Sequence, residues 1–429
     1  NNRFGAFPSF SIGWRISEEE FFKADWVDNL KLRASWGSIG NDSQLNASQF
    51  VSGWQFEDRF ILGGAGNSSA SITNGMKEAN LANPNITWYK VMTTNVGLDG
   101  SFWGGKLSFE FDYFYRKTTG YPATRNTSLP TTSGIPLPQE NLNSSDNRGF
   151  ELSLGTVQRI GNVNLQIKGN VAYAREKDLY KEQALPLNQY KNWRDNGAYR
   201  WKNVTWGYEH IGQFQSYDEI YNSPIQDGKG NSSLRPGDIK YKDLNGDGLI
   251  DANDEKVIGK GTFPDLNFGL TLAADWKGFD VNILFQGASN YTQVLNALTS
   301  PFRGPGEGNG FRVWMDSWHK ADYNDPDSEW VPGKFPSLRI EGNDNNSKKS
   351  TYWTTDAYYV RLKSIEIGYT IPKNLLSKVG IEHLRVYANA YNPLTITNVK
   401  YTDPEAIEGW QSFYYPQLKV YSFGVNVSF

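Results

Sequence analysis

The sequence contains no cysteine, and its 429 residues include only three histidines and three methionines. The absence of cysteine excludes disulfide bonds and thiolate metal centres, and it suits an exported bacterial protein. The formal net charge is −3, so the chain lacks the basic surplus that nucleic-acid-binding proteins carry. Mean hydropathy is −0.59, and no stretch approaches the roughly 18 apolar residues that a membrane-spanning helix needs.

Residues that would support catalysis are also sparse. His210, His319 and His383 lie far apart and show no metal-ligand spacing. The sequence has no nucleophile elbow and no glycine-rich phosphate loop, and pairs of loop carboxylates do not by spacing alone define a glycosidase. The sequence therefore predicts a protein that is not an enzyme.

Aromatic residues, in contrast, make up 15% of the chain. A membrane β-barrel accounts for many aromatics together with low hydropathy, because only alternate residues face lipid while Tyr, Phe and Trp gather at the two interfaces. A secreted, calcium-stabilised β-sandwich that binds carbohydrate would have the same composition. Composition alone leaves both classes open.

The last nine residues alternate apolar and polar side chains up to the end of the sequence. The apolar face consists of Tyr421, Phe423, Val425, Val427 and Phe429, and the polar face of Ser422, Gly424, Asn426 and Ser428. Such a strand, with an aromatic last residue, is typical of an outer-membrane barrel, where one face meets lipid and the other lines the lumen.

Ten further segments have strand-like character, most of them with clear alternation, so the sequence predicts an all-β chain with about 11 antiparallel strands. The predicted strands cover residues 4–16, 30–38, 88–102, 106–118, 148–160, 163–175, 265–276, 279–291, 358–371, 381–391 and 416–429. A slip in the alternation at Lys363 and Ser364 predicts a β-bulge. The odd strand count suggests part of a larger, even-numbered transmembrane barrel.

The predicted connections alternate between short and long. Tight turns at 103–105, 161–162 and 277–278, and short helical turns at 17–29 and 372–380, lie on the side where Phe429 ends. Long loops occupy the other side, at about residues 40–87, 119–147, 177–263, 292–357 and 392–415. Short periplasmic turns and long extracellular loops are typical of outer-membrane barrels, whereas a soluble sandwich has no reason to follow this rule.

Six segments spread along the chain carry a family resemblance. They are FPSFSIGWRISEEEFF at 7–22, LKLRASWGSIGN at 30–41, NRGFE at 147–151, PGDIKYKDLNGDG at 236–248, YVRLKSIEIGYTIP at 359–372 and LRVYANAYNP at 384–393. Together these segments resemble the C-terminal half of SusC/RagA-type TonB-dependent transporters of Bacteroidota.

The resemblance implies an integral protein of the bacterial outer membrane, surrounded by lipid, with residues 1–429 as the C-terminal half of a 22-stranded barrel. It also implies an N-terminal plug and first strands that fall outside this chain, coupling to TonB–ExbB–ExbD through that missing part, and a SusD-like lipoprotein lid. The implied function is import of oligomeric nutrients, either glycan or peptide. A SusC-like barrel that serves as a scaffold in a larger outer-membrane assembly or secretion complex is the alternative.

A calcium-type motif lies in the long loop 177–263. Residues 243–254 place oxygen ligands at the spacing of an EF-hand loop, with Gly248 at the sixth position for the turn. The predicted ligands are Asp243, Asn245, Asp247, Leu249 through its carbonyl, Asp251 and Asp254. We expect a structural Ca²⁺ that stiffens the loop, with Ile250 packed inward. The twelfth position is aspartate instead of glutamate, and a metal-free turn rich in Asp and Asn is the alternative.

Tryptophans gather in the two longest loops, where they could stack on a ligand, contact the lid or simply pack. The candidates for ligand or lid contact are Trp193, Trp201, Trp206, Trp314, Trp318 and Trp330. Strand alternation also places polar residues such as Glu110, Asp112 and Gln286 on the predicted lumenal face.

Overall fold

The computed structural model describes residues 4–45, 49–62, 71–125, 137–183, 188–295, 298, 310–339, 344–376, 380–406 and 417–429. Parts of the predicted loops 40–87, 119–147, 177–263, 292–357 and 392–415 therefore lie outside the described residues. The chain divides into two compact units. The first unit contains Asn1–Leu152 and Ala174–Lys202, and the second contains Ser153–Tyr173 and Asn203–Phe429.

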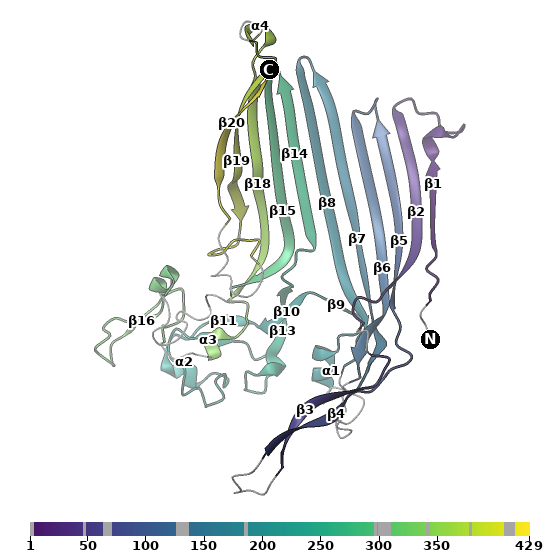
Figure 1. The fold of residues 1–429 in the computed structure, drawn as a ribbon. Helices are drawn as coiled ribbons and strands as arrows, with labels where there is room; N and C mark the ends of the chain where they lie inside the picture. The colour runs from purple at the N-terminus through teal and green to yellow at the C-terminus, as the bar shows by residue number, and fades with distance from the viewer. Residues whose placement is uncertain are drawn as a thin grey trace. The chain divides into compact units, whose positions relative to one another are not determined.

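The first unit is built on strands that follow one another in the sheet in chain order (Figure 1). They are β1 (Ser9–Arg15), β2 (Val27–Asn41), β5 (Tyr89–Phe102), β6 (Leu107–Thr124), β7 (Gln139–Ile160) and β8 (Val163–Tyr180), the last two shared with the second unit. A separate ribbon pairs β3 (Gly53–Leu62) with β4 (Ser71–Asn80). The remaining elements are η1 (Ile16–Glu18), α1 (Gln189–Asp195) and β9 (Arg200–Trp201), which pairs with β8.

The second unit continues from β8 with antiparallel strands, again in chain order. They are β14 (Leu266–Trp276), β15 (Phe279–Val294), β18 (Thr354–Thr370), β19 (His383–Thr397) and β20 (Val420–Ser428). Smaller pairs join β10 (Val204–Tyr208) to β13 (Glu255–Lys260), β11 (His210–Gln213) to β12 (Ile239–Tyr241), and β16 (His319–Lys320) to β17 (Trp330–Val331). The helices are α2 (Tyr217–Tyr221), η3 (Ala252–Asp254), η5 (Arg312–Asp316), α3 (Asp344–Ser347) and α4 (Lys373–Leu376).

The structure confirms all 11 predicted strands, and it places them in one sheet that counts 12 strands with β9. The predicted bulge is also present, because Lys363 has no partner in the register of β18 with β15 or with β19, while Leu362 and Ser364 do. In the second unit, the turn between β14 and β15 lies at the same end as α4, and the small loop elements lie at the other end (Figure 1).

The short turns have the geometry that their residues allow. Between β5 and β6, Trp103, Gly104 and Gly105 all adopt positive φ values of 58°, 69° and 77°. The carboxylate of Asp28 accepts hydrogen bonds from the backbone N–H groups of Gly104 and Gly105, at 2.9 and 2.8 Å. Glycine takes this left-handed conformation without steric cost, so the turn can be tight.

Several strands continue further than the alternation predicted. β6 extends to Thr124 and β7 begins at Gln139, so the loop expected at 119–147 is shorter at both ends. β7 has 22 residues and β8 has 18, well beyond the roughly 9–11 that cross a bilayer. The extension of β7 carries mostly polar side chains on both faces, so the alternation signal is lost there although the strand continues.

The apolar side chains of the last strand are exposed. In β20, Tyr421, Phe423 and Val425 are 63%, 86% and 59% exposed, as expected for a face that meets lipid. Within the described ranges, none of the helices has the length and apolar character needed to cross a membrane.

The largest buried core of the second unit lies among its long loops. It brings together residues from 203–263 with residues that follow β15 and precede β18. Its buried members are Ile239, Tyr241, Ile250, Leu295, Leu298, Trp314, Phe335 and Trp353. The loops therefore form a folded body of their own.

Candidate functional site

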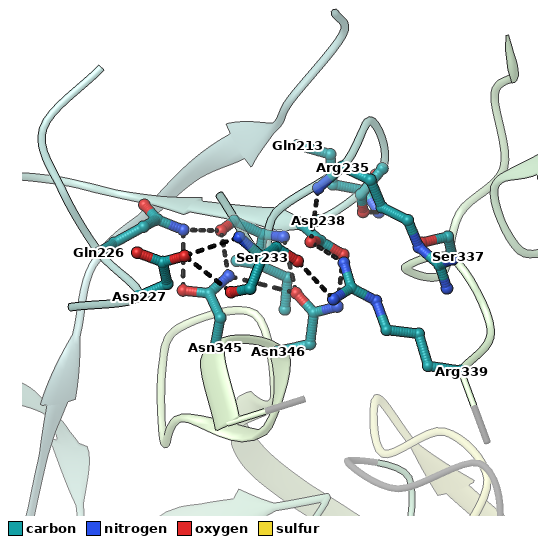
Figure 2. Close-up of polar contacts among 12 residues, drawn as sticks. Gln213, Gln226, Asp227, Ser233, Arg235, Asp238, Ser337, Arg339, Asn345 and Asn346 are labelled. Carbon is teal, nitrogen blue, oxygen red and sulfur yellow. Dashed lines mark hydrogen bonds and ion pairs between the residues drawn. The ribbon is translucent and has the colours of Figure 1, made fainter. Parts of the chain in front are cut away.

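A buried polar network joins the two long loops of the second unit (Figure 2). Asp238 is fully buried and forms an ion pair with Arg339. Its carboxylate also accepts hydrogen bonds from the backbone N–H of Arg235 at 3.0 Å and from Nδ2 of Asn346 at 2.8 Å. Burial raises the pKa of Asp238, and the neighbouring Arg339 opposes that shift.

Amide side chains complete this network. Nε2 of Gln226 donates to the carbonyl of Ile239 at 2.6 Å and to Oδ1 of Asn345 at 2.8 Å. Asn346 accepts from the backbone N–H of Ile239 at 3.0 Å. Because four of these contacts join residues more than 100 positions apart, the network fixes the two loops against each other.

A tight turn beside the network is organised by one carboxylate. Oδ1 of Asp227 accepts from the backbone N–H groups of Lys229 and Asn231, and Oδ2 accepts from the N–H and the hydroxyl of Ser233. Partial burial works against ionisation here, but these hydrogen bonds prevail and lower the pKa of Asp227 to about 2. The ionised form is therefore the one that holds the turn.

We predict that Asp227→Asn destabilises this turn and the loops around it by about 1–3 kcal/mol at neutral pH. The reason is that the amide NH2 group replaces one carboxylate oxygen and then faces N–H or O–H groups that need an acceptor. The folded pKa lies below the ordinary value of 3.8, so the carboxylate stabilises above about pH 4, and this stabilisation is lost as pH falls through about 2. Protease resistance of the loops, measured from pH 7 to pH 2, should therefore show the two proteins converging in acid. The exposed Asp218→Asn serves as control, and an equal loss in both variants would contradict the assignment.

The calcium-type loop is compact, and its carboxylates bind backbone N–H groups. Asp243 accepts from Gly246 at 2.6 Å and from Gly248 at 2.9 Å, and these bonds, from Gly248 first, lower its pKa. Asp254 is fully buried and accepts from the N–H groups of Leu244 and Asp251. Ile250 packs inward as predicted. Among the described residues, no three His, Cys, Asp or Glu side chains converge on one metal position.

The remaining predicted ligands lie on the exposed rim of this loop. Asn245 donates to Asp247 at 2.9 Å and accepts from its N–H at 3.0 Å. The side chain of Leu249 is 45% exposed, and its backbone pairs with Ile225 in an isolated bridge. Asp251 caps η3, where its side chain accepts from the N–H of Asn253. The oxygen-rich spacing is present, and a bound ion stays a prediction.

The candidate tryptophans have different environments. Trp314 and Trp318 are each only 4% exposed, so in the structure their rings pack within the loops. Trp193 is 55% exposed on α1 and lies 5.7 Å from the guanidinium carbon of Arg200. Contact of these rings with a ligand or a lid stays a prediction.

Trp201, Trp206 and Trp330 are half-buried. The ring of Trp201 is approached by Arg175 at 4.5 Å and by Arg148 at 5.4 Å, in cation–π geometry.

Ionic clusters along the strands were not foreseen from the sequence. In the first unit, Arg33 binds Asp112 at 2.7 Å and Asp99 at 3.0 Å across three neighbouring strands. In the second unit, Arg385 bridges Asp280 and Glu366. Alternation in the sequence placed Asp112 on the polar face of its strand. Its pairing with Arg33 depends on the register between neighbouring strands, and a single sequence does not specify that register.

A cavity of about 560 Å³ lies in the first unit, on the polar face of its extended strands. Its lining includes Tyr89 from β5, Arg116 and Tyr121 from β6, and Lys181 just after β8. The rings of Tyr89 and Tyr121 lie 5.2 Å apart at an angle of 58°. None of these residues was a candidate from the sequence, since the cavity forms where the polar strand extensions pair.

Antiparallel strands in chain order, polar on one face and apolar on the other, define the wall of an outer-membrane β-barrel. The family model described as TonB dependent receptor-like, beta-barrel matches residues 1–393. The chain therefore belongs to the TonB-dependent receptor β-barrel family and is part of an integral outer-membrane protein.

Individual relatives agree with this family. The whole chain aligns with TonB-dependent receptor P3 of Formosa agariphila at 28% identity over 42% of that protein. It aligns with TonB-dependent receptor SusC of Bacteroides thetaiotaomicron at 25% identity over 40% of that protein. The chain thus spans about two fifths of the length of these relatives.

Solved structures show the same fold. The RagAB peptide importer in its open-open state superposes with a TM-score of 0.72 at 21% identity, covering 100% of this chain and 43% of that one. A second structure of the RagAB peptide transporter gives a TM-score of 0.69 at 21% identity, covering 100% of this chain and 44% of that one.

Proposed function

We propose that the protein containing this chain is a SusC-like TonB-dependent transporter that imports an oligomeric nutrient, glycan or peptide, across the outer membrane. The observation that carries the proposal is the alignment of the whole chain with SusC, together with its membership of the receptor family. In this proposal TonB–ExbB–ExbD supplies energy through a part of the protein outside this chain. A SusD-like lipoprotein covers the extracellular mouth.

The polar face of the sheet supports import over a scaffold role. Paired charges such as Arg33 with Asp112, and a cavity on the same unit, suit a wall along which a hydrophilic solute passes. A scaffold in an assembly or secretion complex would need contacts on its outer surface but no polar passage.

Deletion of the gene followed by growth on a panel of oligosaccharides and peptides tests this proposal. We expect loss of uptake of one class of oligomer, restored by the intact gene and not by a version that cannot engage TonB. Mass spectrometry of the purified native complex should find a lipoprotein partner. Unchanged uptake together with a defective envelope would instead favour the scaffold.

We also propose that residues 243–254 bind a structural Ca²⁺. Support comes from the six oxygen positions of the motif, and from Ile250, which anchors the loop in the core next to Tyr241. Calcium prefers six to eight hard oxygen ligands, and the side chains of this motif are rich in such oxygens. The ion would stiffen the loop and take no part in catalysis.

For this calcium proposal, we predict that the double variant Asp243→Asn with Asp247→Asn weakens Ca²⁺ binding at least about tenfold, because two ligand charges are lost. Calcium titration of the full-length protein, read out by terbium displacement and by protease resistance, measures the effect. Asp327→Asn, in an exposed loop outside the motif, is the matched control. Equal calcium affinity in all three proteins would rule the site out.

We further propose that the tryptophans with accessible rings contact the transported ligand or the lipoprotein lid. Trp193 is the strongest candidate because of its exposure, followed by the half-buried Trp201, Trp206 and Trp330. Uptake and lid association of the Trp193→Ala protein provide its test.

A further inference from the structure

The cavity of the first unit lies on one face of the sheet. Its lining includes the alternate residues Tyr89 and Val91 of β5 and Arg116 and Thr118 of β6, three consecutive residues of β7, and further residues of β8. Glu110 and Asp112, on the same face of β6, mark this as the polar face. The volume of about 560 Å³ falls within the range of about 300–1,000 Å³ usual for ligand pockets.

The charges of this cavity are not balanced. Lys202 is held by Glu176 at 2.6 Å and by Asp178 at 3.1 Å, so these three groups satisfy one another. Arg116 and Lys181 are exposed and form no ion pair or hydrogen bond with any residue that the structure describes. Three cations thus face two carboxylates, and two cations remain available for an anionic ligand.

The rest of the lining is suited to sugar hydroxyls. Tyrosines supply aromatic surface on which the C–H face of a sugar ring can pack, because ring edges and faces carry opposite partial charge. Amide and hydroxyl groups supply hydrogen bonds, from Asn41, Thr118, Asn143, Ser144 and Ser145. Val91 is the one aliphatic residue in the lining as described, so a peptide would find no apolar pocket for its side chains.

We propose that this cavity binds an acidic sugar unit of the imported oligomer, with Arg116 and Lys181 receiving its carboxylate or sulfate. Tyr121, which is 40% exposed, provides the stacking surface. The inference rests on the proposed import function and specifies its substrate class as an acidic oligosaccharide.

Binding measurements on the purified full-length protein with its native partners test the inference. The probes are a tetramer of galacturonic acid, a sulfated galactose tetramer, neutral maltotetraose and a glutamate-rich tetrapeptide. We expect at least one acidic sugar to bind more tightly than maltotetraose and the peptide. Arg116→Gln combined with Lys181→Gln should weaken that binding about tenfold or more, because charge-assisted hydrogen bonds to the acidic group are lost. The same double variant should leave any binding of maltotetraose unchanged.

Lys117→Gln is the matched control, because it removes a cation from the adjacent position of β6, whose side chain points to the opposite face. Arg116→Lys should retain most of the affinity. Unchanged affinity in the double variant, absence of binding by both acidic sugars, or preference for the acidic peptide would each overturn the inference. Uptake assays separate the two claims. Uptake that is unchanged on deletion of the gene, together with acidic-sugar binding by the purified protein, would refute transport and leave the binding site standing.

Discussion

Replacement of Trp353 by alanine is expected to unfold the loop body of the second unit while the strands remain paired. Trp353 is 1% exposed, and its Nε1 donates to the carbonyl of Asn346 at 2.7 Å. It also contacts Trp314 and Phe335, with ring centroids 6.2 and 6.4 Å away. Truncation of a buried aromatic leaves a cavity and an orphaned acceptor, at a cost of about 3–5 kcal/mol.

Hydrogen exchange and limited proteolysis of the full-length protein measure this effect, and the compact mobility of the unheated protein on detergent gels reports on the barrel. We expect exchange to rise throughout residues 203–263, 310–339 and 344–353, with unchanged gel mobility. Trp54→Ala, which removes a ring that is 68% exposed, should leave exchange in these loops as it is. Protection that survives in the Trp353→Ala protein would show that the loops do not depend on this core.

The second large effect is expected at Arg361, a strand residue that is 2% exposed. Its guanidinium binds both carboxylate oxygens of Asp403, at 3.0 and 2.9 Å, and Glu405 at 2.8 Å. Arg361→Met leaves two partly buried carboxylates side by side without their cation. Breaking such a pair from one side costs about 3–5 kcal/mol, and here it should detach residues 398–406 from β18.

A combined variant makes the Arg361 prediction sharper. Adding Asp403→Asn and Glu405→Gln to Arg361→Met removes the stranded charges, so part of the lost stability should return. The temperature at which the protein loses its compact gel mobility provides the measurement. Lys363→Met, two residues along the same strand, is the control and should change little. A combined variant less stable than Arg361→Met alone would show that the charges are not the cause.

Strand positions could be predicted from the sequence because alternation is a local property that each strand carries in its own residues. The segment 106–118, with Phe109 and Phe111 opposed to Glu110 and Asp112, needed no knowledge of its neighbours. Alternation failed in the polar extension of β7, from Gln139 onward, where the backbone pairs but neither face is apolar. The membrane location followed from the same repeated pattern, and the family resemblance from six segments such as residues 236–248.

Partners in the ionic clusters and the cavity could not be predicted, because they depend on register and loop closure. Arg361 meets Asp403 and Glu405 only after the chain has turned through the connection beyond β19. Tryptophan is equally suited to a surface and to a core, so composition did not separate the exposed Trp193 from the buried Trp314.

The bulge at Lys363 has a consequence for how the sheet tolerates changes of length. Even-numbered residues of β18 such as Tyr358 and odd-numbered residues such as Ile367 are both exposed, 46% and 52%, because the extra residue reverses the parity between them. Removing Lys363 would restore a regular register of β18 with β15 and leave every other side chain of β18 on its present face. Removing one residue from the middle of β14, whose register with β8 and β15 is regular throughout, would turn half of that strand over. The sheet therefore contains a position where one residue can be lost without moving polar side chains to its apolar face or apolar side chains to its polar face.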